Sequence, residues 1–99
     1  MTPELQQADL ALATFEQLFA DLSLHVEVLG ISAKGGATHY AGADSLDLEG
    51  ARAALLAGAV RGVQIRYRYQ GSEWWDTILA LSGTFRLVRT RPDFTAATP

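Results

Sequence analysis

The fold of this chain is decided by residues 63–91, which read VQIRYRYQGSEWWDTILALSGTFRLVRTR. Apolar and polar side chains alternate along three segments of this stretch, as they do in half-buried strands. Gly71-Ser72 and Ser82-Gly83 separate the segments, and such pairs suit the two-residue loops of hairpins. The stretch therefore predicts a three-stranded antiparallel meander.

The two turns also predict which residues lie opposite each other. In the first hairpin Arg68 faces Trp75, and in the second Asp76 faces Arg89, an acid and a base that can satisfy each other at a margin of the sheet. Both registers sort the side chains into the same two faces. The predicted core face carries Ile65, Tyr67, Tyr69, Trp74, Ile78, Ala80, Phe85 and Leu87. The opposite face carries Arg66, Arg68, Trp75, Thr77, Leu79, Arg86, Val88 and Thr90.

Two helices are expected before the meander. The first is predicted to begin at a Thr2 cap with Pro3 in its first turn. Its apolar stripe has helical spacing and consists of Leu5, Ala8, Leu12, Phe15, Leu18, Phe19 and Leu22. The second, shorter helix is predicted to run from an Asp47 cap to a stop at Gly58.

Strands are expected between these helices. Residues 24–32 alternate and predict a strand with a bulge at Gly30, and residues 37–40 are expected to return as a short strand. The predicted fold is α+β, in the order α-β-(β)-α-β-β-β. Two helices would pack on one face of a four- or five-stranded, mainly antiparallel sheet that ends in the meander. We expect one domain over residues 1–99, with 93–99 as a mobile tail.

Composition excludes several classes of protein. The chain has no cysteine, which excludes disulfides and thiolate metal sites. No apolar run approaches the roughly 20 residues that cross a bilayer, and no secretory signal is visible. We therefore expect a cytoplasmic protein that does not enter membranes. Charge is uneven: residues 1–50 hold eight acids against one lysine (−7), and residues 51–99 hold seven arginines against three acids (+4).

The face opposite the predicted core has the composition of a protein interface. Tryptophan and arginine are enriched at interface hot spots, and exposed apolar residues on one face form a patch that a monomer normally hides. The candidate interface consists of Arg66, Arg68, Trp75, Leu79, Arg86 and Val88. Arg68 is expected to stack on Trp75 in a cation–π contact. The alternative is that the tail, or residues 37–40, cover this face within the chain.

These observations predict a non-enzymatic interaction or accessory domain. Its partner would be a second copy of the chain, giving a homodimer, or another protein with an acidic surface. The arginine-tyrosine run at residues 66–69 also raises single-stranded nucleic-acid binding. An isoelectric point of about 5.2 disfavours nucleic-acid binding, which is the third hypothesis. Strand alternation also disfavours it, because the tyrosine rings and the arginine charges of this run lie on opposite faces of the predicted sheet.

A second hypothesis places a small ligand, or the site of a minor enzyme, in a pocket between helices and sheet. The candidate pocket residues are His25, Glu27, His39, Tyr40, Tyr67 and Asp76. His25 and Glu27 are two apart in a predicted strand and would share a face. A metal needs three or four ligands, and His39 is distant in sequence, so no metal is predicted. No phosphate-binding or catalytic motif is present, and no cofactor is expected.

Overall fold

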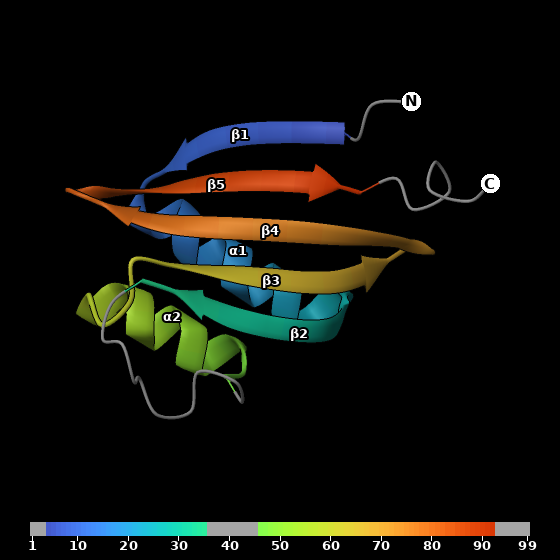
Figure 1. Ribbon diagram of the computed structural model, residues 1–99, viewed down its shortest axis with the longest axis horizontal. Coiled ribbons are helices and arrows are strands. Elements are labelled where there is room, and N and C mark those ends of the chain that lie inside the picture. Colours follow the sequence, from blue (N-terminus) through green and yellow to red (C-terminus); the bar gives the residue numbers. More distant parts are fainter. Residues whose placement is uncertain (1–3, 36–45, 93–99) are drawn as a thin grey trace.

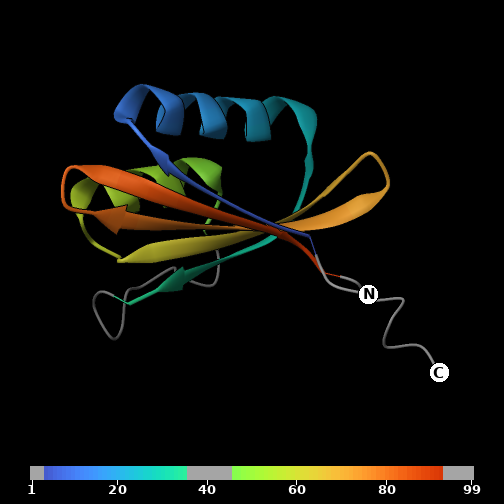
Figure 2. The same ribbon diagram turned by 90° about the horizontal axis from the view of Figure 1, so that it is seen from above.

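A computed structural model describes residues 4–35 and 46–92. Its five-stranded antiparallel sheet has the order β1-β5-β4-β3-β2, and both helices lie on one side of this twisted sheet (Figures 1 and 2). The strands are β1 (Glu4–Leu10), β2 (Glu27–Lys34), β3 (Gly62–Tyr69), β4 (Ser72–Leu81) and β5 (Thr84–Arg91). The helices are α1 (Leu12–His25) and α2 (Leu48–Ala57). The predicted α+β class and C-terminal meander are confirmed.

The described chain begins with a strand where the sequence predicted a helix. β1 pairs with β5 along its whole length, and the order of elements is β-α-β-α-β-β-β. The predicted start at Thr2 and Pro3 lies outside the described residues. The helix prediction over Glu4–Leu10 was wrong because β5 offers an unpaired edge on its far side. Hydrogen bonding to that edge outweighs helix propensity, which is a weak preference that tertiary context overrides.

Because α1 is shorter than the predicted helix, only part of the predicted apolar stripe is buried on it. Phe15, Phe19 and Leu22 are buried on α1, as predicted. Leu5 and Leu12 are 64% and 56% exposed, because one lies on an edge strand and the other in the first turn of the helix. The core therefore begins later in the chain than helical spacing indicated.

The second hairpin has the predicted register, whereas the first is shifted by two residues. The first turn lies at Gln70-Gly71, and not at Gly71-Ser72. Both loop residues have positive φ (52° and 82°), as a type I′ turn requires. Arg66 consequently lies opposite Trp75. A shift of two residues keeps each side chain on its predicted face, because neighbouring side chains alternate.

The strand between the helices starts later than predicted. His25 is the last residue of α1, and β2 begins at Glu27. The predicted bulge is confirmed by a register shift between Val28 and Gly30. The short strand predicted at residues 37–40 lies outside the described residues, as does the tail at 93–99.

The second helix has the predicted boundaries. The Asp47 side chain accepts a hydrogen bond of 2.7 Å from the Gly50 N–H at the start of α2. Gly58 ends the helix with φ at 72°, a left-handed conformation that glycine adopts without strain. Arg52 joins this helix to α1 by an ion pair of 3.0 Å with Glu16.

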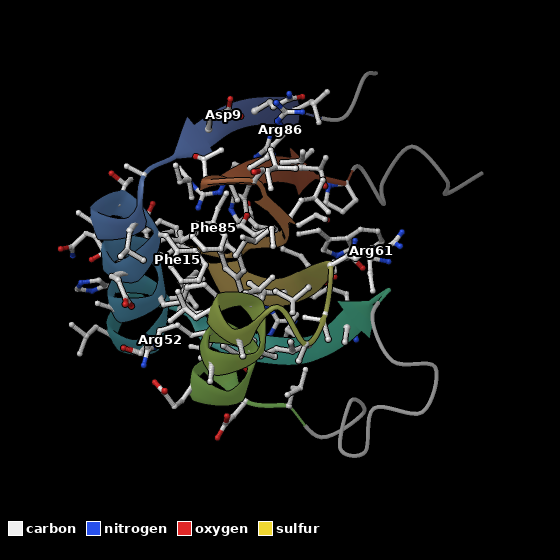
Figure 3. All side chains as sticks on the ribbon, turned by 90° about the vertical axis from the view of Figure 1, so that its left-hand side faces the viewer. Asp9, Phe15, Arg52, Arg61, Phe85 and Arg86 are labelled. Atoms are coloured by element: carbon white, nitrogen blue, oxygen red, sulfur yellow. The ribbon has the colours of Figure 1, made fainter. Side chains whose placement is uncertain are left out.

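The core lies between the helices and the predicted core face of the sheet. Ile65 and Ile78 are fully buried there. Phe15 of α1 stacks on Phe85 of β5 with ring centroids 4.0 Å apart, and both rings lie between helix and sheet in Figure 3. The buried core comprises Leu10, Phe15, Phe19, Leu22, Ile31, Ala51, Ala54, Leu55, Val60, Val63, Ile65, Tyr67 and Ile78.

Replacing Phe15 should destabilise the domain strongly. Phe15→Ala leaves a cavity beside Phe85 and should lower the free energy of unfolding by about 3–5 kcal/mol. Urea denaturation measures this change. Leu24→Ala on the same helix is the control, because Leu24 is 75% exposed and its loss should change stability by under about 0.5 kcal/mol. Similar effects of the two variants would contradict this placement of the core.

The turn of the first hairpin gives a second prediction. Gln70→Asn should raise stability by about 0.5–1 kcal/mol, since asparagine tolerates the left-handed backbone better than glutamine. The thermal unfolding midpoint measures the gain. Ser82→Asn in the other hairpin is the control, because Ser82 does not have positive φ. A gain at Ser82 but none at Gln70 would refute the observed turn.

Candidate functional site

One face of the sheet carries no helix, and we call it the open face. The predicted interface residues all lie on it: Arg66, Arg68, Trp75, Leu79, Arg86 and Val88. Within residues 4–35 and 46–92 no element covers this face (Figure 2). Trp75, Leu79 and Val88 are half-buried by their own sheet neighbours. The structure thus brings the predicted residues together on one surface.

Acidic neighbours hold two of the arginines on the open face. Arg68 Nη1 lies 3.2 Å from Glu27 Oε1, and Arg86 Nε lies 2.9 Å from Asp9 Oδ1. The second pair is labelled in Figure 3, and the hydrogen bond from Arg86 lowers the pKa of the Asp9 carboxyl. Much of the positive charge on this face is therefore balanced within the face.

The predicted cation–π contact between Arg68 and Trp75 was wrong. The shifted register places Glu73, and not Trp75, opposite Arg68. Trp75 instead donates its indole N–H to Glu73 Oε2 at 2.7 Å. A cation–π contact instead joins Arg91 to Trp74 on the helix side, with the guanidinium carbon 5.7 Å from the ring centroid.

Two glycines keep the open face flat. A Cβ atom on Gly30 would lie 2.5 Å from Arg66 Nη2, and one on Gly62 would lie 2.8 Å from Leu79 Cδ2. The missing side chains let Arg66 and Leu79 lie close against neighbouring strands. Both side chains consequently lie flat over the sheet.

On the helix side, a buried carboxylate joins the three strands of the meander. Asp76 on β4 is 0% exposed. Arg89 on β5 donates from Nε to its Oδ1 and from Nη2 to its Oδ2, both at 2.8 Å, and the Tyr67 hydroxyl on β3 donates to Oδ1 at 3.0 Å. The predicted opposition of Asp76 and Arg89 is confirmed. Its predicted place at the sheet margin was wrong, because β4 is the central strand.

The surroundings of this network fix its protonation. Burial, together with the negative charge of Asp76, raises the pKa of Tyr67 far above that of free tyrosine. The hydrogen bond to Asp76 raises the pKa of Arg89. At neutral pH Tyr67 is therefore a neutral hydrogen-bond donor and Arg89 is a permanent cation.

A groove of about 550 Å³ lies beside this network, between α1 and the sheet. Apolar side chains of α1 and of the sheet form its walls, and its polar groups include Arg89. The lining residues are Leu10, Thr14, Gln17, Leu18, Asp21, Leu22, His25, Val26, Tyr67, Tyr69, Leu87 and Arg89. In Figure 2 the β3–β4 hairpin rises on the helix side, beyond the end of α1.

The groove unites only part of the predicted pocket. His25 and Tyr67 line it, and Asp76 is reached through Tyr67 and Arg89. Glu27 lies elsewhere and pairs with Arg68, because β2 begins after the last turn of α1. His39 and Tyr40 lie outside the described residues.

Several residues of the groove were not predicted from the sequence. Arg89 could have been found, since it was predicted to face Asp76. Gln17 and Asp21 gave no such signal, because their place depends on how α1 lies across the sheet.

No group of three or more His, Cys, Asp or Glu residues in the described ranges has the geometry of a metal site. Among the described residues, no helix has the length and apolarity needed to cross a membrane. In comparisons with known proteins, no family model, curated protein or solved structure matches this chain.

The Tyr67 network predicts a loss of stability at alkaline pH. Folded Tyr67 keeps its proton above the ordinary tyrosine value of 10.0, so the unfolded chain loses that proton first. Stability associated with Tyr67 is full below that value and declines as pH rises through and above it. Tyr67→Phe should therefore flatten the decline of the urea midpoint between about pH 9.5 and 11.5. Parallel profiles for the two proteins would refute the raised pKa.

Proposed function

We propose that this protein is a non-enzymatic, cytoplasmic interaction domain that pairs with a second copy of itself through the open face. The observation that carries this proposal is the placement of both helices on one side of the sheet (Figure 2). The other side presents Trp75, Leu79 and Val88 together. Burial of such residues in a dimer removes apolar surface from water, which is the main driving force of association.

The charges of the open face favour a second copy over a strongly acidic partner. Arg68 and Arg86 already have carboxylate partners in the same surface. Arg66 makes no ion pair with any residue of the described ranges. A surface with nearly balanced charge can meet its own copy about a twofold axis without strong repulsion.

The area of the open face is also close to that of a protein–protein interface. Strands of this length extend over roughly 25 Å, and five strands give a width of roughly 24 Å. The resulting face approaches the roughly 800 Å² that each partner contributes to a standard interface. Two twisted sheets pack face to face when their strands cross at about 30°, with the side chains of both faces interdigitated.

Sedimentation equilibrium over a concentration series tests this function. We expect a mass near twice the 10.7 kDa of one chain, and a dissociation constant that Trp75→Ser raises by about tenfold or more. Leu56→Ser is the matched control: Leu56 is 42% exposed on α2, away from the open face, and its loss should leave the mass unchanged. A single-chain mass for the wild type at every concentration would refute the dimer. Equal effects of the two variants would exclude the open face as its interface.

A further inference from the structure

The groove lies beside the buried ion pair of Asp76 and Arg89, and a contribution to stability alone does not explain this pair. Asp76 is fully buried, and the Arg89 side chain is only 28% exposed. Removing charges from water is costly, and well-packed apolar residues in place of a buried ion pair are often as stable or more stable. A buried ion pair at this position is explained if one of its members also contacts a molecule in the groove.

Arg89 is held in a fixed orientation at the groove. Asp76 engages Nε and Nη2 of the guanidinium, and the Tyr67 hydroxyl holds the same carboxylate. The Nη1 group is the part of the guanidinium that Asp76 does not occupy, and Arg89 is one of the lining residues. Donors fixed in advance in this way lose little freedom when they bind an acceptor.

We propose that the groove binds an uncharged amphipathic molecule, with a hydroxyl or carbonyl oxygen at Arg89 and an alkyl chain or ring against Leu18, Leu22 and Leu87. The proposal concerns the helix side of the sheet and does not depend on pairing through the open face. The volume of about 550 Å³ lies within the range of known ligand pockets.

The charges around the groove argue for an uncharged head group. The positive charge of Arg89 is already neutralised by Asp76 at 2.8 Å. Asp21 also lines the groove, so a carboxylate would meet an excess of negative charge. The carbonyl groups at the C-terminal end of α1, beside His25, add to this excess. An ammonium group and the Nη1 group are both hydrogen-bond donors, so an amine cannot accept a hydrogen bond from Arg89, whereas a hydroxyl or carbonyl oxygen can.

Three ligands with one tail and different heads test the class. Nile red, a neutral dye, serves as the fluorescent probe, and decanol, decanoate and decylamine compete with it on the full chain. We expect decanol to displace the dye at concentrations about tenfold lower than either charged molecule. Tightest binding of decanoate or decylamine would overturn the assigned class. No binding of Nile red or of any of the three would overturn the site.

Variants locate the site. Leu18→Gln should weaken decanol binding by about tenfold, whereas Leu24→Gln should not change it. The second variant makes the same chemical change on the same helix, at a residue that does not line the groove. Equal affinities of the two variants would place the ligand elsewhere.

A test of the role of Arg89 requires a variant in which no buried charge is left without its partner. The triple change Tyr67→Phe, Asp76→Leu and Arg89→Met removes the whole network together. We expect it to bind the alkyl chain but to lose the preference for decanol, and a retained preference would overturn the role of Arg89. The guanidinium NMR resonances of Arg89 in the wild-type protein supply a measurement independent of that variant's folding. They should shift on addition of decanol, and unchanged resonances would overturn the proposed contact.

Discussion

The structure depends on the burial of one carboxylate in the central strand. Asp76 can be ionised away from water only if neighbouring strands supply donors, and here β3 supplies Tyr67 and β5 supplies Arg89. A slip of β5 by two residues would move Arg89 by roughly 7 Å and leave the charge without its cation. The same network therefore favours one register of the meander, and it contributes Tyr67 and Arg89 to the lining of the groove.

Strand alternation places two unlike surfaces back to back on the same residues of the chain. The adjacent tryptophans illustrate this: Trp74 lies on the helix side beneath Arg91, and Trp75 lies on the open face and binds Glu73. A sheet of one layer can thus have an apolar groove on its helix side and a broad open face on the other side, because alternate side chains of each strand belong to different faces.

The meander was predictable because its signals are local. Alternation set the faces correctly even where the first turn was misplaced, since a two-residue shift preserves facing, and Asp47 and Gly58 marked α2 by known cap chemistry. β1 was not predictable in this way, because a segment with helical spacing becomes a strand only when β5 offers it an edge. The groove was not predictable for a similar reason: His25 and Arg89 line the same groove only because of the angle at which α1 crosses the sheet.

The pairing of β1 with β5 determines when the domain can be completed. The meander of β3, β4 and β5 forms from contacts between neighbours in sequence, which close quickly. Among the described strands β1 is synthesised first, yet its partner β5 is synthesised last, and Glu4 pairs with Arg91. On the ribosome β1 therefore waits unpaired until β5 has emerged. During that interval the backbone N–H and C=O groups of β1 have no strand partner, so β1 is the segment of the nascent chain that is exposed to pairing with other chains.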